Sequence, residues 1–275
     1  MKAWGGNQMA KIQLVALDLD GTLLTDEIVI DKKAKEAIRK VREKGINVTL
    51  ATGRMFSSAQ SFAVELGIEL PMIVYHGAQV RHPITGEVFF ERGLPLSLAE
   101  CIIRHIRHYG YAYNVYLDDK LYVENIKKEN IEYVERTGVK LYKVDDMLDF
   151  LKKGPLKIVA LQEGDKLDLL EEDIKRDVGD KVYITRSLPF YLETLNREAN
   201  KARGLKALAE MEGFKAEEIM VFGDSYNDIE MFKYAGISIA MGNAPETVKA
   251  YADYVTGTNN EGGVAKALEK FILGG

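Results

Sequence analysis

Hydrophobic residues follow two alternating periods in the first part of the chain. Continuous apolar runs, typical of strands buried on both faces of a sheet, occur at 12–17, 46–51 and 72–75. Apolar residues at helical spacing separate these runs and predict helices at 32–44 and 55–66. Asp31 is the expected N-cap of the first helix, and Gly45 marks its end. Strands that alternate with helices in units of this length predict a parallel α/β sheet.

The pattern changes from about residue 78. The stretch 78–93 alternates and turns like hairpins, and Ser97 with Glu100 predicts a capping box for a helix through about His108. A further hairpin with Asp118-Asp119 at its turn is followed by apolar and mixed segments, which include a helix from about 166 to 177. This region predicts an α+β insert with an antiparallel sheet.

The α/β alternation returns from Lys201. Helices are expected at 201–212, 227–235, after Pro245 and at 263–273, with the strands "IMVFGD" and "ISIA" between them. We therefore predict a doubly wound, Rossmann-like parallel-sheet core made of 1–84 plus 188–275. The α+β insert at 85–187 would be a cap domain.

Composition narrows the class of protein. The 275 residues are 47% hydrophobic and 29% charged, with a formal net charge of −5 and no basic block, so a nucleic-acid partner has no electrostatic support. No apolar run approaches the roughly 20 residues that span a bilayer, so no membrane partner is expected. The opening "MKAWGGNQMA" lacks the apolar core of a secretion signal, and residues 1–8 are interpreted as an extension before a start at Met9.

The single cysteine, Cys101, has no partner for an internal disulfide, which is typical of a reducing compartment. We therefore expect a cytoplasmic protein. Because Cys101 lies in the apolar stretch "CIIRHI", a packing role is favoured over a reactive thiol, and the nearby His105 and His108 are interpreted as surface or packing residues. The alternating tyrosines of the insert are expected on a sheet face: Tyr111, Tyr113, Tyr116 and Tyr122.

Carboxylates stand where strands of the predicted core end. Asp18 and Asp20 follow the first strand in "LVALDLDGTLL", and Asp224 ends a later strand in "VFGDSYND". Thr52-Gly53 follows the second strand and precedes a helix whose N-terminal amides favour an anion. Because carboxyl ends of parallel strands line one crevice, these groups are expected to lie together. Buried like charges need a counter-charge, and an all-oxygen set suits Mg²⁺ better than zinc.

This set of groups predicts phosphoryl chemistry. A divalent cation beside a hydroxyl and helix-end amides suits phosphoryl transfer, and an adjacent carboxylate can act as the nucleophile through an aspartyl-phosphate.

Four stretches carry a family resemblance. They are Asp18 to Leu23, Thr52-Gly53-Arg54, Lys201, and Gly223 to Asp228. Their order and separation resemble the haloacid dehalogenase superfamily, and the insert resembles the large α/β cap of its Cof-type phosphatases. The resemblance implies Asp18 as nucleophile and Asp20 as general acid and base. It also implies Mg²⁺ held by Asp18, the Asp20 carbonyl and Asp224, with Ser225 near. Phosphate would be bound by these residues: Leu19 and Gly53 (amides), Thr52, Lys201 and Asn227.

Some positions depart from the family pattern or have simpler interpretations. His76-Gly77-Ala78 replaces the frequent Asn-Gly-Ala, Ala202 follows Lys201, and Tyr226 replaces small or acidic residues, so His76 and Tyr226 are candidates for substrate selection. Thr52 could serve only as a helix cap and Lys201 only as a surface lysine. Asp228 is expected to orient its neighbours, Arg54 has no assigned role, and the loop 258–264 is interpreted as a polar turn.

The resulting hypothesis is Mg²⁺-dependent hydrolysis of small phosphate monoesters, with sugar phosphates the class implied by the resemblance. The partner would be a small phosphorylated metabolite, over which the cap would close. Two alternatives stay open: a sugar phosphomutase of the same fold, and a phosphometabolite-binding protein with very slow turnover.

Overall fold

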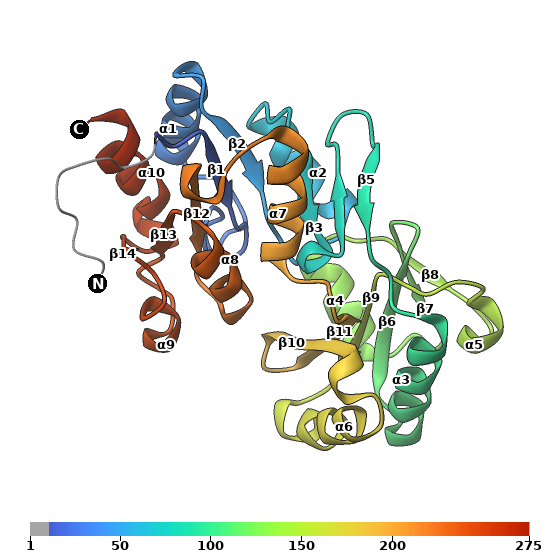
Figure 1. Cartoon of the computed structure of the whole chain (residues 1–275). Helices are drawn as coiled ribbons and strands as arrows, with labels where there is room; N and C mark the ends of the chain where they lie inside the picture. The colour runs from blue at the N-terminus through green and yellow to red at the C-terminus, as the bar shows by residue number, and fades with distance from the viewer. Residues whose placement is uncertain (1–10, 275) are drawn as a thin grey trace. The chain divides into compact units, whose positions relative to one another are not determined.

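Figure 1 shows the chain as a computed structural model, which describes residues 11–274. The expected extension at 1–8 and the start at Met9 therefore lie outside the described residues. The chain divides into two compact units. The first unit contains the described residues up to 52, residues 59–90 and those from 201 onward; the second contains 53–58 and 91–200. These ranges differ from the expected divisions at 84/85 and 187/188, and the strand pairing described below accounts for the difference.

The first unit is built on a five-stranded sheet in the order β14-β13-β12-β1-β2, and every pair in it is parallel. Its strands are β1 (Leu14–Leu17), β2 (Asn47–Leu50), β12 (Ile219–Gly223), β13 (Ile237–Ala240) and β14 (Tyr254–Val255). Leu17 pairs with Phe222 of β12 on one side and with Leu50 of β2 on the other. The chain order reverses at β1, which is the place in such sheets where ligands bind beyond the carboxyl ends of the strands.

Helices with one apolar face accompany this sheet. They are α1 (Lys32–Glu43), α2 (Phe56–Glu65), α7 (Lys201–Glu212), α8 (Ile229–Tyr234), α9 (Glu246–Lys249), α10 (Gly263–Leu268) and a terminal turn η6 (Glu269–Leu273). The predicted cap of α1 is confirmed, because the Asp31 carboxylate accepts from the amides of Lys33 and Ala34. Leu205 and Leu208 of α7 pack with β1 and β12 in the core. The predicted fold class is confirmed.

The third apolar run forms a strand outside the main sheet. β3 (Met72–Val74) pairs antiparallel with β4 (Gln79–Arg81), and β5 (Val88–Glu91) completes a three-stranded sheet. A single bridge, Ala51 to Ile73, connects this sheet to the extension of β2. The turn η1 (Tyr75–Gly77) joins β3 to β4, and its residues Tyr75 and His76 have φ of 51° and 54°. This turn reverses the chain, so β3 pairs with its own neighbour.

The second unit contains a six-stranded sheet in the order β10-β11-β9-β6-β7-β8. Its strands are β6 (Ala112–Leu117), β7 (Lys120–Val123), β8 (Leu141–Lys143), β9 (Lys157–Leu161), β10 (Val182–Leu188) and β11 (Tyr191–Asn196). The pairs are antiparallel except β7 with β8. The predicted turn of the β6–β7 hairpin is confirmed, since Asp118 and Asp119 both have positive φ. Because β11 pairs with β9 and β10, residues 188–200 belong to this unit.

Helices α3 and α6 supply the apolar cover of this sheet. The helices of the unit are α3 (Leu96–Tyr109), α4 (Lys128–Thr137), α5 (Met147–Phe150), α6 (Gly164–Asp177) and a turn η2 (Gly179–Lys181). Ile102 and Ile106 of α3 and Leu170 of α6 pack with β6 and β9 in one core. Cys101 also packs against this core, and burial raises the pKa of its thiol, in agreement with the predicted packing role.

The predicted capping box at Ser97 is wrong. The N-cap of α3 is Pro95, and no side chain caps this helix end. The amides of Leu98 and Ala99 both donate to the Pro95 carbonyl, so the helix begins earlier than the Ser97 and Glu100 pattern implied. Of the helices between residues 11 and 274, none has the length and apolar content needed to cross a membrane.

Candidate active site

The side chain of Lys201 joins two buried carboxylates at the centre of the first unit. Lys201 is the first residue of α7 and is 1% exposed. Its Nζ lies 2.6 Å from Asp18 Oδ1 and 2.6 Å from Asp228 Oδ1. Burial alone would lower the pKa of Lys201, but the charges of Asp18 and Asp228 outweigh it and raise that pKa above its usual range. Lys201 is therefore a buried ammonium, and the surface-lysine interpretation is wrong.

Asp228 holds the loop that follows β12. It lies in the turn η4 (Tyr226–Asp228), and its Oδ2 accepts from the amides of Asp224 and Ser225, both at 3.0 Å. A Cβ at Gly223 would lie 2.4 Å from the Asp228 Cγ, so this position has room only for glycine. With one oxygen on Lys201 and the other on two amides, Asp228 orients its neighbours, as the sequence indicated.

Asp224 contacts the first motif from the other side. The Thr22 hydroxyl donates to Asp224 Oδ1 at 3.2 Å. Gly21 has φ of +73°, and a Cβ there would lie 2.4 Å from Asp224 Oδ2, so glycine permits both the turn and the approach of the carboxylate. Thr22 lies within the "DLDGTL" motif but was not predicted as a site residue.

The loop after β1 places Leu19 and Asp20 differently. Leu19 is fully buried, whereas Asp20 is exposed. The amide of Leu23 donates to the Asp18 carbonyl and the amide of Leu24 to the Leu19 carbonyl, which closes the loop into a compact turn. The Asp20 carboxylate lies close enough to Asp224 for its charge to raise the pKa of Asp224 slightly.

The electrostatics of this carboxylate cluster match those of a cation site. Oxygens of Asp18, Asp224 and Asp228 all lie within 4.8 Å of one another. Burial raises the pKa of Asp18 well above its usual value, against the opposing charge of Lys201, and the charges of Asp228 and Asp224 add to the rise. Burial and the Asp228 charge raise the pKa of Asp224 to about 7.

Within residues 11–274, two residues of the cluster keep an oxygen outside these hydrogen bonds. Both Asp228 oxygens bond within the protein, whereas Asp18 and Asp224 each have a second oxygen outside the pairs described above. A divalent cation bound to these two residues would neutralise the repulsion, and an oxygen-only donor set suits Mg²⁺.

Thr52 lies beside β1 at the carboxyl end of the β2 segment. It is fully buried; its amide donates to the Ile73 carbonyl at 2.8 Å, and its carbonyl accepts from the His76 amide at 3.0 Å. These bonds fix the Thr52 backbone beside β3, and α2 begins only at Phe56, four residues further along the chain. Gly53 follows in the chain and groups with the second unit, where its carbonyl accepts from Lys157 Nζ at 3.0 Å.

Asn227 contacts His76 in the first unit. Its Nδ2 lies 3.2 Å from His76 Nδ1, and its Oδ1 is buried with no hydrogen-bond partner among residues 11–274. His76 is 1% exposed. It stands where the family often has asparagine, and it contacts Asn227, a predicted phosphate-binding residue. Tyr226, the other departure, is exposed, and its hydroxyl pairs with Thr247 at 3.0 Å.

Two asparagines that the sequence analysis did not single out support the first motif. Asn243, just beyond β13, donates from Nδ2 to the Gly21 carbonyl at 2.8 Å and accepts from the Asn259 amide at 3.0 Å. Asn259, in the turn η5 (Asn259–Glu261), donates to the Leu24 carbonyl at 3.0 Å. The loop 258–264 is therefore more than a polar turn, and the strand-end rule that found Asp18 also marks Asn243.

Comparison with known proteins decides the family. The haloacid dehalogenase-like hydrolase family matches residues 15–268. The chain belongs to this family.

This hydrolase has phosphatases among its relatives. It is 31% identical to the 5-amino-6-(5-phospho-D-ribitylamino)uracil phosphatase YcsE of Bacillus subtilis, covering 95% of this chain and 96% of the relative. A haloacid dehalogenase-like hydrolase from Bacteroides thetaiotaomicron has a TM-score of 0.88 at 30% identity, over 95% of this chain and all of that one. The subclass IIB sugar phosphatase BT4131 has a TM-score of 0.83 at 25% identity, over 94% and 98%. The predicted family and enzyme class, a phosphoric monoester hydrolase, are confirmed.

Proposed function

We propose that this hydrolase cleaves small phosphate monoesters with Mg²⁺ through an aspartyl-phosphate on Asp18. The observation that carries the proposal is the buried bridge from Asp18 through Lys201 to Asp228, with Asp224 beside it. A buried carboxylate paired with an ammonium at a strand end is poised to meet a phosphoryl group, because the ammonium screens the repulsion between two anions.

The two proposed steps use Asp18 and Asp20. In the first, an Asp18 oxygen attacks phosphorus, the bond to the leaving oxygen breaks, and Asp20 gives that oxygen its proton. In the second, Asp20 takes a proton from water, the water oxygen attacks phosphorus, and the bond to Asp18 breaks to release phosphate. Asp20 is exposed, so it can exchange protons with solvent between turnovers.

The remaining predicted residues bind rather than react. Lys201, Asn227 and the Thr52 hydroxyl would hold phosphoryl oxygens, together with the amides of Leu19 and Gly53. Mg²⁺ would be held by the carboxylates of Asp18 and Asp224 and the Asp20 carbonyl, with Ser225 near. When bound, it supplies positive charge that polarises the phosphoryl group. The raised pKa values of Asp18 and Asp224 support this assignment, because they record first the burial of negative charge and then the repulsion between the carboxylates, both of which a cation relieves.

We infer a phosphorylated sugar or polyol as the substrate class. BT4131 is a sugar phosphatase, and the name of YcsE contains a phosphorylated ribityl group. Both relatives match nearly the whole chain, so the similarity includes the second unit as well as the first.

The test is phosphate release from a panel of sugar phosphates, polyol phosphates, nucleotides and one aryl phosphate, each with Mg²⁺ and with chelator. We expect metal-dependent release that Asp18→Asn abolishes and Glu27→Gln, an exposed carboxylate in the same loop region, leaves intact. An isomerised sugar phosphate without free phosphate would indicate a mutase instead. Tight binding without either product would indicate a binding protein.

A further inference from the structure

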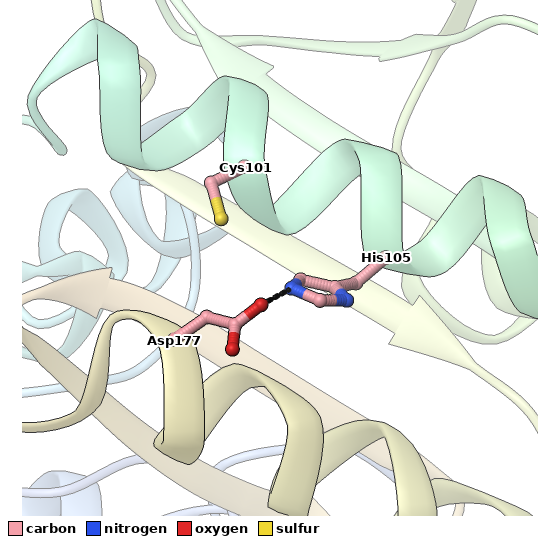
Figure 2. A group of neighbouring side chains, drawn as sticks. All are labelled: Cys101, His105 and Asp177. Carbon is pink, nitrogen blue, oxygen red and sulfur yellow. Dashed lines mark ion pairs between the residues drawn. The ribbon is translucent and has the colours of Figure 1, made fainter.

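Three side chains of different chemistry meet on the helix layer of the second unit. Figure 2 shows Cys101 and His105 on α3 facing Asp177, the last residue of α6. The Cys101 Sγ, a ring nitrogen of His105 and a carboxylate oxygen of Asp177 all lie within 4.8 Å of one another. None of these residues takes part in the proposed phosphatase chemistry, so the cluster is separate from the active site.

The backbone holds this cluster in place. Residues 101 and 105 are four apart on one helix, which puts both side chains on the same face. Helices α3 and α6 share the apolar core beneath them, so the face of α3 stays opposite the end of α6. The ligand atoms thus come from two helices whose separation is set by packing, not by flexible loops.

The distances allow an ion to enter with little movement. His105 Nε2 lies 2.9 Å from Asp177 Oδ2, as the dashed line in Figure 2 marks. Around a tetrahedral metal with bonds of about 2.0–2.2 Å, the same two atoms would be about 3.4 Å apart. A displacement of roughly half an ångström therefore turns the ion pair into two metal ligands. The His105 and Asp177 side chains are 18% and 40% exposed, so an ion can reach them from solvent.

The surrounding charges leave the ligand atoms available. Arg176 contacts the other Asp177 oxygen, Oδ1, at 3.1 Å and also pairs with Asp173 at 2.6 Å. Burial and the Asp177 charge raise the pKa of the Cys101 thiol, and the nearby Arg104 offsets part of that rise. The charges of the two carboxylates, Asp173 and Asp177, are therefore balanced by the two guanidinium groups of Arg104 and Arg176. The Asp177 oxygen that faces His105 is Oδ2, whereas Arg176 contacts Oδ1.

We propose that Cys101, His105 and Asp177 bind a transition-metal ion of the zinc type. Thiolate, imidazole and carboxylate together suit Zn²⁺ or Co²⁺, whereas Mg²⁺ prefers oxygen alone. Three protein ligands leave a fourth position for water. The bound ion joins α3 to α6 and stabilises the second unit. This proposal is independent of the proposed function and concerns a different unit of the chain.

The chain itself makes the test specific, because Cys101 is its only cysteine. Co²⁺ is titrated into the full-length protein, stripped with chelator, in excess Mg²⁺ so that the active-site carboxylates are saturated. A thiolate-to-cobalt charge-transfer band can then arise only from Cys101. We expect a saturable band at one Co²⁺ per chain, which Zn²⁺ removes by displacing the cobalt.

Single substitutions assign the ligands. Cys101→Ser should abolish the band. His105→Gln and Asp177→Asn should each weaken Co²⁺ binding at least about tenfold, because loss of even a residue that only hydrogen-bonds to a metal ligand lowers metal affinity by that factor. His108→Gln is the matched control, because His108 lies on the same helix and contacts Tyr109 instead. It should bind Co²⁺ as the wild type does.

A measurement on the wild-type protein guards against variants that misfold. Zn²⁺ in excess Mg²⁺ should slow alkylation of Cys101 by iodoacetamide at least about tenfold, because a metal-bound thiolate is a poor nucleophile for the reagent. The proposal is overturned if no thiolate band appears at millimolar Co²⁺. It is also overturned if Zn²⁺ leaves the alkylation rate unchanged, or if folded His105→Gln and Asp177→Asn bind Co²⁺ as tightly as the wild type.

Discussion

Replacing Asp224 with asparagine should stabilise the metal-free protein while it destroys the response to Mg²⁺. Without a cation, the Asp224 carboxyl is largely buried beside Asp228, and its pKa rises from 3.8 to about 7. Between these two values the folded protein retains a proton that the unfolded chain releases. Folding therefore loses stability as the pH rises through this window, and the loss is complete above about pH 7.

The magnitude follows from the pKa difference. At 1.36 kcal/mol per pKa unit, the interval from 3.8 to about 7 corresponds to roughly 4 kcal/mol of unfavourable free energy when Asp224 is charged. Asp224 is partly exposed, and solvent screening reduces the gain on removing its charge to about 2 kcal/mol. Asparagine keeps an oxygen that can accept from Thr22, so the variant retains the hydrogen bond.

The assay is denaturant unfolding of wild type and Asp224→Asn in EDTA at about pH 8 and about pH 5. At the higher pH the variant should be more stable by about 2 kcal/mol, and at the lower pH the advantage should shrink to roughly a third, because the wild-type carboxyl is then largely protonated in the folded state. Added Mg²⁺ at pH 8 should stabilise the wild type and leave the variant nearly unchanged. Glu27→Gln serves as a control for removing an exposed charge.

Two results would refute the reasoning. One is a variant no more stable than wild type at pH 8 in EDTA, which would mean that burial of Asp224 carries no electrostatic cost. The other is an equal advantage at both pH values, which would assign the effect to packing instead of charge.

Three further changes test other parts of the site. Lys201→Met leaves two buried carboxylates unpaired and should lower the free energy of unfolding at pH 8 by about 3–5 kcal/mol, whereas full stability by urea denaturation would contradict a buried bridge. Gly223→Ala should lower kcat at least about tenfold in the phosphate-release assay, because its Cβ would displace the carboxylate that orients Lys201. Gly45→Ala, where a Cβ meets open space but the φ of +78° strains an alanine, should lower stability and keep kcat. His76→Ala should lower kcat/KM about tenfold, the value of one hydrogen bond to Asn227, and His76→Asn should restore part of it; equal activities would remove His76 from the site.

Local patterns were enough to predict much of the core. Apolar runs and helical spacing mark which faces are buried, so they predicted the parallel sheet around β1 and the carboxylates at its strand ends. The Asp31 cap and the Asp118-Asp119 turn were also predictable, because each depends on residues at most three apart in the chain. Asp18 and Asp224 could be paired from sequence because parallel strands bring their carboxyl ends to one edge.

Only the tertiary structure determined which strands pair with one another. β11 lies just beyond a predicted boundary but pairs with β9, and β3 pairs with β4 instead of extending the main sheet. Strand pairing is a long-range choice that periodicity does not encode. The two hydrogen-bonding contacts of Asp228, one to Lys201 and one to the Asp224 loop, likewise depend on distances of a few ångströms. The raised pKa of Asp224 depends on its burial. The burial of these groups and the bonds that bring Asp18 to Lys201 and Thr22 to Asp224 arise only when segments some 200 residues apart pack together. The sequence therefore predicted which charged residues meet but not their interaction energies.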